Sequence, residues 1–450
     1  MFDKKSLLGS YWELEECDER SILSSSQKNN ISPLLAKLLL IRNIDDKLVN
    51  DYLYPNINEK LPDPFLLKGI EKAVERTIKA IFEKQKLGII ADYDVDGSTS
   101  ASILYKFLNN FTNNIFVETP NRLSEGYGPN HRLMDQMLKK NVNLVFTLDC
   151  GTTSFDIIDN KKYSSLDVIV IDHHLSEAIL PKVFSIINPN RFDENNDYQQ
   201  MSAVGVTFLF LMALRKKLRI SKYFNHYNLE PNLMNYLDLV ALGTICDVVE
   251  LKDYNRVFVK IGLDIIKQRK NKAISKMIDN SNINSTPTST DLAFIIGPQI
   301  NAASRIDDSL LPSKLLTSKR IDEIESISRK LLLLNEKRKL IENQIFEDAI
   351  IQSENQEAKN YILVYGKNWH NGVLGIVASR ILSIYYKPTI VISFNGSLGL
   401  GSARSIKNID LGNIILEAKN KKMLLSGGGH QMAAGFKIEF DFIEKFKNFI

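Results

Sequence analysis

The stretch Leu87-Gly-Ile-Ile-Ala-Asp-Tyr-Asp-Val-Asp-Gly97 places a short apolar run directly before three carboxylates. Two similar apolar runs follow, at Leu144–Leu148 and Val168–Ile171, and each is again followed at once by an aspartate. Runs of this length are too short for a helix and are typical of strands that are buried on both faces of a parallel sheet.

Amphipathic segments at Ser100–Phe111 and Leu133–Lys139 separate the three runs. The alternation predicts a β–α–β–α–β unit, whose strands form a parallel sheet with right-handed crossovers. In open sheets of this kind, ligands bind beyond the carboxyl ends of the strands. The predicted fold class is therefore α/β, with a parallel sheet whose aspartates gather at one edge.

The rest of the chain divides around this unit. Apolar residues at helix spacing before residue 85 predict an N-terminal helical segment, and a periodic pattern from Ser318 to about Gln356 predicts one long helix that joins two lobes. Beyond it, strand-like runs at Tyr361–Val364 and Thr389–Ser393 flank a helical segment, Val373–Tyr385. The predicted domains are a helical segment (1–85), a parallel-sheet domain (86–316), a connecting helix (317–356) and a smaller α/β domain (357–450).

The composition describes an ordinary globular chain of 450 residues, 44% apolar and 24% charged, which is long enough for two or three domains. No apolar run is long enough to span a bilayer and the N-terminus has no signal-type segment, so we expect a cytoplasmic location without membrane contact. The three cysteines, Cys17, Cys150 and Cys246, form no CxxC pair, which argues against a disulfide framework and against a structural zinc site.

The charge is unevenly distributed although the net value is only +4. Residues 361–450 contain 11 Lys and Arg but 5 Asp and Glu. A basic C-terminal domain beside a slightly acidic body is expected where phosphates dock on the first and metal-binding carboxylates lie in the second. A solvated, lysine-rich surface would explain this count about as well.

Asp92, Asp94 and Asp96 form the strongest local signal for chemistry. Like charges this close raise one another's pKa unless cations neutralise them, so a divalent metal site is the natural explanation. An EF-hand loop would begin similarly, but its required Glu at the twelfth position is Ile103 here. The remaining alternative is a solvated acidic turn.

Three more motifs follow predicted buried segments: Asp149-Cys-Gly-Thr152, the run Asp172-His173-His174, and Gly243-Thr-Ile-Cys-Asp247. Mixed carboxylate and imidazole ligands suit Mn²⁺, or Mg²⁺ with more water. Together the motifs supply enough ligands for two neighbouring cations, an arrangement used in phosphodiester hydrolysis. Cys150 beside the site is interpreted as a small buried residue.

The ordered motifs DYDVDG, DCG, DHH and GTICDVVEL resemble the four motifs of the DHH phosphoesterases, and the DYDVDG form is that of the RecJ-type branch. The C-terminal segments resemble a DHHA1 domain. Further agreement comes from Leu61–Leu67, Asn121-Arg122, Glu125–Gly128, Gly297–Arg305, Gly372–Arg380, Gly401–Ser405 and Gly427–His430. The resemblance covers nearly the whole chain.

The resemblance implies roles for individual residues. The implied ligands of two Mn²⁺ or Mg²⁺ ions are Asp94, Asp96, Asp149, His173 and Asp247. The implied catalytic residues are His174, which would contact the scissile phosphate, and Asp92, a ligand or a partner of the ligands. The implied phosphate or nucleic-acid contacts are Arg122, Tyr127, Asn301, Arg305, Arg380, Ser402, Arg404, Gly428, Gly429 and His430, because arginine forks and close glycine backbones suit phosphate.

The implied function is a 5′-to-3′ single-stranded-DNA exonuclease that releases 5′-mononucleotides in recombination and repair. The implied partners are single-stranded DNA, single-strand-binding protein and helicases, and we expect a monomer. One alternative is a short-oligonucleotide or nucleotide phosphodiesterase of the same superfamily. Another is a non-catalytic single-strand-binding relative, which would lack metal ligands, whereas none of the expected ligands is missing here.

Two departures from the RecJ-type pattern stand out. Such enzymes usually continue past the Gly427–His430 segment into an OB-fold, whereas this sequence ends about twenty residues later. We therefore expect catalysis to survive and affinity for long DNA to be reduced. The second departure, Ser304 in place of a glycine before Arg305, is a small change.

Overall fold

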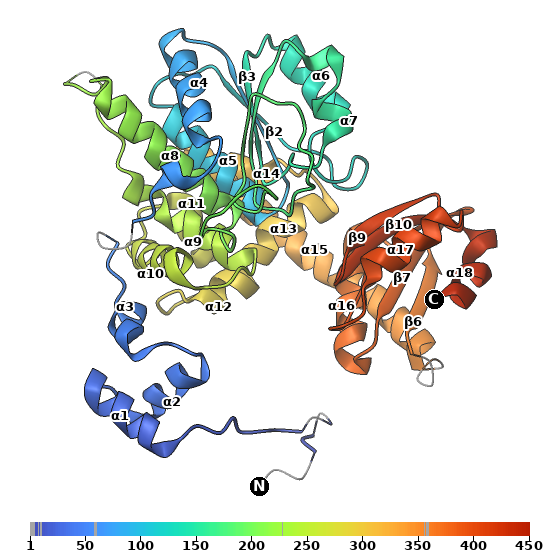
Figure 1. Ribbon diagram of the computed structural model, residues 1–450. Helices are drawn as coiled ribbons and strands as arrows, with labels where there is room; N and C mark the ends of the chain where they lie inside the picture. Colours follow the sequence, from blue (N-terminus) through green and yellow to red (C-terminus); the bar gives the residue numbers. More distant parts are fainter. Residues whose placement is uncertain are drawn as a thin grey trace.

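The computed structural model describes the chain except residues 1–4, 8, 10, 58–60, 227, 355 and 357–359. The expected starts of the N-terminal segment and of the C-terminal domain, residues 1 and 357, therefore lie outside the described residues. Two lobes, each with its own sheet, are joined by the long helix α15 (Ile321–Glu354) (Figure 1).

The first lobe contains a five-stranded sheet in the order β2-β1-β3-β4-β5, with all neighbouring strands parallel. This confirms the predicted α/β class. The unbroken apolar runs form the three central strands, whereas the edge strands β2 and β5 were not predicted because they are short. The strands are β1 (Leu87–Ala91), β2 (Ile115–Glu118), β3 (Leu144–Leu148), β4 (Asp167–Ile171) and β5 (Ser185–Ile187).

Successive residues of the central strands feed two cores on opposite faces of the sheet. Phe146 contacts the ring of Phe210 in the larger core, whereas its neighbour Val145 packs with Leu133 and Met137 on the other face. Each fully buried side chain of this size contributes roughly 1.5–3 kcal/mol. The helices of this lobe are α4 (Ile70–Phe82), α5 (Val95–Leu108), α6 (His131–Lys139), α7 (Phe155–Ile158), α8 (Ala203–Ile220), α9 (Leu237–Cys246), α10 (Asp253–Lys267), α11 (Lys272–Asn280), α12 (Ser289–Asp291), α13 (Gly297–Ile306) and α14 (Leu311–Thr317).

Helix α5 begins five residues before the expected position at Ser100, because Asp94 caps it. The Asp94 carboxylate accepts a hydrogen bond from the Gly97 backbone N–H at 3.0 Å. Asp96 therefore lies in the first turn of a helix, where the helix dipole favours negative charge. Gly97 is needed here because a Cβ atom would lie 2.3 Å from the Asp92 carbonyl oxygen.

The N-terminal region contains α1 (Glu19–Asn29), α2 (Pro33–Ile41) and α3 (Val49–Leu53), and the pair α1–α2 stands apart from the first lobe in Figure 1. The region is attached to α10 through Arg256. Its guanidinium lies 3.6 Å from the centre of the Tyr52 ring and donates to the Tyr52 carbonyl at 2.6 Å.

The second lobe contains the sheet β6-β7-β8-β10-β9, in which only β6 and β7 are parallel. The antiparallel half was not predicted. Leu398–Arg404 and Ser426–His430 are glycine-rich and lack the apolar pattern of a strand, and the alternating run Ala433–Glu439 was not recognised. The elements are β6 (Ile362–Lys367), α16 (Leu374–Tyr385), β7 (Thr389–Asn395), β8 (Leu398–Arg404), α17 (Leu411–Asn420), β9 (Ser426–His430), β10 (Ala433–Glu439) and α18 (Ile443–Phe449).

The two lobes also meet beyond α15, where α13 touches the short turn Asn371–Val373. The Arg305 guanidinium donates to the Gly372 carbonyl at 2.9 Å, and a Cβ atom on Gly372 would lie 2.2 Å from the Arg305 carbonyl oxygen. Only glycine permits this approach. In the part of the chain that the structure describes, no helix has the length and apolar character to cross a membrane.

Candidate metal centre

The acidic and imidazole motifs meet at the carboxyl edge of the first sheet. Those that follow β1, β3 and β4 come together because neighbouring parallel strands end side by side, and Asp247 joins them from the end of α9. Three groups each have ligand atoms within 4.8 Å of one another: Asp92, Asp94 and Asp149; Asp96, His173 and Asp247; and Asp149, His173 and His174. Because Asp149 and His173 belong to two groups each, the three groups form one continuous cluster.

His173 lies at the centre of the cluster. Its Nε2 atom is 3.3 Å from an Asp149 oxygen, 3.6 Å from an Asp247 oxygen and 3.8 Å from an Asp96 oxygen. Its Nδ1 atom lies 3.1 Å from the Met201 carbonyl, which can only accept, so Nδ1 carries the proton. The Nε2 lone pair therefore points at the carboxylates, which is the orientation that a hydrogen bond from the other ring nitrogen gives to a metal ligand.

The backbone fixes two of the carboxylates. Asp149 adopts φ +58°, a conformation uncommon outside glycine, asparagine and aspartate. Asp96 accepts hydrogen bonds from the Ala203 and Val204 backbone N–H groups, at 2.6 and 2.8 Å, so the start of α8 holds it in place. Both carboxylates are therefore positioned before any ligand arrives.

Several ligand atoms in the cluster are buried and unsatisfied. Within the described part of the chain, Asp92 Oδ1, Asp149 Oδ1, His173 Nε2 and Asp247 Oδ2 have no hydrogen-bond partner. Buried polar atoms normally have one, and leaving them unpaired costs about 1–3 kcal/mol each, or more when charged. A set of oxygen and imidazole donors facing a common centre fits a hard divalent cation.

The pKa values of the carboxylates also indicate a cation site. Burial, and then the charges of neighbouring aspartates, raise the pKa values of Asp92, Asp96 and Asp149 well above the usual range. Burial, with the charge of Asp94, raises the pKa of Asp247 to about 7. A bound cation would reverse these shifts, because it stabilises the ionised form of every carboxylate around it.

The two adjacent histidines differ in protonation. Burial, and then the charge of His174, lower the pKa of His173 to about 4, so His173 is neutral and able to ligate. Burial also opposes the charged form of His174, but the hydrogen bond from its Nδ1 to Asp172, at 2.8 Å, raises its pKa to about 9. The Tyr127 hydroxyl lies 3.1 Å from the same nitrogen and donates to the Asp149 carbonyl at 2.6 Å. His174 is therefore a cation beside the cluster.

Four arginines from separate parts of the chain lie close enough for their charges to act on one another, and one of them, Arg122, also acts on Asp92. Arg122 stacks on the Tyr93 ring at 4.8 Å, and its charge partly opposes the rise that burial causes in the pKa of Asp92. Burial, and then the charges of Arg122, Arg338 and Arg404, lower the pKa of Arg305 to about 9. Such an accumulation of cations is unfavourable unless an anion joins it.

The other predicted phosphate contacts differ in their surroundings. Ser402 accepts a hydrogen bond from Arg404 at 3.3 Å, and the Oδ1 atom of Asn301 is buried without a partner among the described residues. Gly428, Gly429 and His430 lie on β9, at the edge of the second sheet.

Arg380 differs from the other predicted arginines because acidic and amide oxygens already engage it. Its guanidinium donates to Glu342 at 3.0 Å and to Asn343 at 2.7 Å, and it stacks on Phe346 at 3.8 Å. This geometry holds α16 against α15. The expected phosphate contact of Arg380 therefore competes with an existing ion pair.

Sequence reasoning missed two contributors. Asp172 accepts from the Thr152 backbone at 3.1 Å and orients His174, although only its histidine neighbours were assigned roles. Arg338 joins the arginines from the middle of α15, where nothing in the sequence marks it among many exposed charges. Asp172 could have been found from its place at the end of β4, whereas Arg338 could not.

The comparisons with known proteins identify the family of the chain. Residues 86–244 match the model of the DHH family, N-terminal domain, and residues 358–450 match the DHHA1 domain. The fold and the site thus define a DHH-family protein with a DHHA1 domain. The chain is also 34% identical over 439 residues to the single-stranded-DNA-specific exonuclease RecJ of Haemophilus influenzae, covering 93% of this chain and 74% of the relative.

The solved structures extend this similarity. The crystal structure of exonuclease RecJ bound to manganese matches with a TM-score of 0.73 and 29% identity, over 85% of this chain and 93% of that one. RecJ from Thermus thermophilus in complex with Mg²⁺ matches with a TM-score of 0.76 and 26% identity, over 97% of this chain and 59% of that one. The chain belongs to the RecJ family. The predicted family is confirmed, and relatives hold both of the predicted metals.

Proposed function

We propose that this chain is a metal-dependent exonuclease that degrades single-stranded DNA from its 5′ end and releases 5′-mononucleotides. The observation that carries the proposal is the cluster of buried, unpartnered carboxylate and imidazole atoms at the sheet edge, in a chain of the RecJ family. The rival roles are less favoured, because all the expected ligands are present and the RecJ relatives match most of the chain.

Two Mn²⁺ or Mg²⁺ ions fit this cluster. Asp94 and Asp149, with Asp92, would hold one, while Asp96, His173 and Asp247 would hold the other. When bound, such ions supply Lewis-acid stabilisation of the charge that develops on the phosphoryl oxygens. Asp149 would also be within reach of the second set of ligands, because its oxygen lies 3.3 Å from His173 Nε2.

The charged His174 is proposed to contact the scissile phosphate. Its Nδ1 is held by Asp172 and Tyr127, and half of its side chain is exposed, so its Nε2 can donate to a phosphoryl oxygen. A fixed cationic donor aimed at developing charge is among the largest single contributions to catalysis. Asp172 and Tyr127 act as positioning residues through this histidine.

The polarity is proposed to come from the arginines. Within the described part of the chain Arg122, Arg305 and Arg404 have no acidic partner, and the charge of Arg122 acts on Asp92. A terminal 5′ phosphate has more negative charge than an internal one. A 5′ end held there would place the first phosphodiester bond at the metal ions. Gly428, Gly429 and His430, from the second lobe, would contact the strand further along.

The decisive experiment digests a single strand labelled at its 5′ or 3′ end in the presence of Mn²⁺. Early release of the 5′ label as a mononucleotide is expected, and Asp149→Ala should abolish it. A duplex of the same sequence should resist digestion. Early release of the 3′ label would refute the polarity, and undiminished activity of Asp149→Ala would refute the proposed site.

The domain limits stay proposals: residues 86–316 as the catalytic domain and 357–450 as the substrate-binding domain, supported by the two family matches within them. We also propose a cytoplasmic monomer that acts in recombination and repair with helicases and single-strand-binding protein. Light scattering of the purified chain tests the monomer. Pull-down with purified single-strand-binding protein, with and without DNA, tests that partnership.

A further inference from the structure

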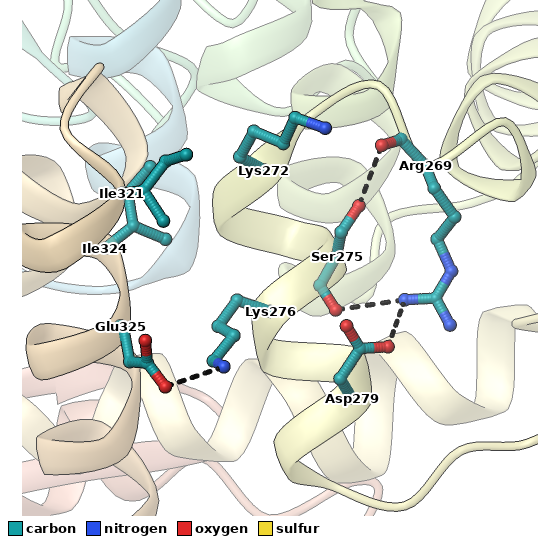
Figure 2. A pocket seen from close by; sticks show the side chains of 8 residues that line it. All are labelled: Arg269, Lys272, Ser275, Lys276, Asp279, Ile321, Ile324 and Glu325. Atoms are coloured by element: carbon teal, nitrogen blue, oxygen red, sulfur yellow. Dashed lines mark hydrogen bonds and ion pairs between the residues drawn. The ribbon is translucent and has the colours of Figure 1, made fainter.

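Two neighbouring pockets lie around the start of α11, on a part of the first lobe that the metal centre does not use. The first has a volume of about 430 Å³ and is drawn in Figure 2. Most of its cations are neutralised there. Arg269 pairs with Asp279 at 3.0 Å, and Lys276 pairs with Glu325 at 2.9 Å. Among the cations drawn in Figure 2, only Lys272 has no ion pair, and Lys272 also lines the second pocket.

The second pocket is larger, about 570 Å³, and its charge is not balanced. Four lysines from different elements line it: Lys106, Lys270, Lys272 and Lys319. Within the described residues none of the four ammonium groups has a hydrogen bond or an ion pair. Lys106 lies near the end of α5 and Lys270 in the loop before α11. Lys272 is the first residue of α11, and Lys319 lies in the loop before α15.

One carboxylate, Asp238, lies deep in this pocket and cannot neutralise four lysines. It is 2% exposed and is already bonded by the Asn271 side chain at 2.8 Å and by the Leu239 backbone at 2.7 Å. Burial lowers the pKa of Lys106; the charge of Asp238 opposes this shift, and the charge of Lys319 adds to it. Lys106 and Lys319 are therefore close enough to repel each other, and an anionic ligand would relieve this repulsion.

The remaining walls suit a base and a sugar. Tyr105 and Tyr236 are half-buried and offer aromatic surface, and Asn109 and Asn235 offer side-chain amides that no described residue engages. The volume lies within the range of small-molecule sites, about 300–1,000 Å³. Aromatic faces with amides and convergent ammonium groups are what a nucleotide with several phosphates requires.

We propose that this pocket binds a nucleoside polyphosphate. The four lysines come from separate elements and line one pocket, so they suit contiguous phosphates better than the spaced phosphates of a DNA strand. The pocket lies at the carboxyl end of α5, whose first turn holds Asp96. A helix of 14 residues spans about 21 Å, so this site is separate from the metal centre. The inference does not depend on the proposed exonuclease function.

The test titrates the full chain with the fluorescent N-methylanthraniloyl derivative of ATP, in EDTA, so that the metal centre recruits no nucleotide. Saturable binding is expected, and ATP and inorganic triphosphate should both displace the probe. Reversing two exposed charges with Lys270→Glu and Lys272→Glu should weaken binding about ten-fold or more. Stronger displacement by ATP than by triphosphate would show that the base and sugar are recognised too.

Two matched variants separate this site from other cationic surfaces. Lys161→Glu with Lys182→Glu makes the same charge change at exposed positions elsewhere on this lobe, and Arg404→Ala weakens the arginine group near the metal centre. Both should bind the probe like the unmodified chain. The proposal is overturned if the chain shows no saturable binding, or if only a DNA oligonucleotide displaces the probe. It is also overturned if the variant with Lys270→Glu and Lys272→Glu binds normally, or if the variant with Lys161→Glu and Lys182→Glu loses as much affinity.

Discussion

The two lobes differ in whether they bury charged side chains. The first lobe buries Asp92, Asp96, Asp149 and Asp172 almost completely, and of these four Asp172 alone has a close hydrogen bond to a charged side chain, His174 at 2.8 Å, among the described residues. In the second lobe, the buried polar side chains among the described residues are hydroxyl groups such as Thr389, and none is charged. Burying a charge is costly unless it is paired. The buried carboxylates of the metal centre therefore lower the stability of the first lobe, whereas the buried polar side chains of the second lobe carry no such cost.

The same contrast extends to how each lobe would use its ligand. The carboxylates of the first lobe need cations to be stable, so metal binding and folding are linked there. The second lobe offers an arginine and exposed glycines to phosphate, and it loses little when no ligand is present. Substitutions should therefore affect stability and activity differently in the two lobes.

The largest effect is expected from Asp149→Asn, which keeps the shape of the side chain and removes its charge. Activity should fall on the order of 10³-fold or more, since a catalytic metal supplies several kcal/mol of stabilisation. In metal-free buffer, however, the variant should melt at a higher temperature, because one buried like charge is gone. Rates in Mn²⁺ and melting curves in EDTA measure both.

The matched control for this variant is Asp156→Asn, which neutralises an exposed aspartate nearby in the sequence. It should change neither the rate nor the melting temperature. If Asp149→Asn were less stable than the unmodified chain in EDTA, the carboxylates would not be repelling one another, and the contrast between the lobes would fail.

A pair of glycines gives the next largest effect. Gly97→Ala would place a methyl group 2.3 Å from the Asp92 carbonyl, so the start of α5 must shift. We expect a loss of about 1–3 kcal/mol in stability and about 10²-fold in rate, since small displacements of catalytic groups are costly. Gly428→Ala meets no atom within 4 Å and should alter stability by less than about 0.5 kcal/mol. Equal destabilisation of both variants, measured by denaturant unfolding, would contradict this account.

A pair of arginines gives a smaller effect. Arg404 has no acidic partner among the described residues, so Arg404→Ala should raise KM for single-stranded DNA about ten-fold at unchanged stability, the value of one charge-assisted hydrogen bond. Arg380→Ala instead leaves the buried Glu342 with one partner fewer and should cost about 1–3 kcal/mol of stability. Steady-state kinetics and thermal melting separate the two. A raised KM in a stable Arg380→Ala variant would restore the expected phosphate contact.

The sequence allowed the centre of the fold to be predicted, but not its edges. Strands β1, β3 and β4 were predictable because each is buried on both faces and therefore apolar at nearly every position. Strand β2 is half-buried throughout and β5 has three residues, so neither has a pattern that exceeds chance. The start of α5 was placed too late because Asp94 was considered only as a metal ligand, whereas it is also the cap of the helix.

The candidate site was predictable to the extent that its groups are side chains at strand ends. Asp149 and His173 lie at or just beyond the ends of apolar runs, so their convergence follows from the parallel sheet. The groups that orient them could not be predicted, because the Met201 carbonyl and the Ala203 N–H are backbone groups, which almost any residue could provide. The approach of Arg338 depends on how α15 packs, which no local pattern reveals.

The smallest effect concerns the pH dependence of folding stability. It tests whether the buried carboxylates destabilise the first lobe when no metal is bound. Asp247 has a folded-state pKa of about 7, raised by burial and by Asp94, above the value of about 4 in an unfolded chain. The folded state then binds more protons than the unfolded state between these values. The contribution of Asp247 to the stability of the metal-free chain should therefore be greatest below pH 4 and should fall as the pH rises towards 7. For one such group the slope is at most about 1.4 kcal/mol per pH unit.

Metal should reverse this trend, because cations bind the ionised carboxylates. Melting temperatures recorded from pH 5 to pH 8 should decline in EDTA by a few degrees, while the increase produced by Mn²⁺ should grow over the same range. Asp247→Asn should flatten the EDTA curve and reduce the Mn²⁺ increment. A metal-free chain whose stability rises steadily from pH 5 to pH 8 would mean that the carboxylates of the first lobe are compensated within the protein itself, and that the cluster has no need of cations.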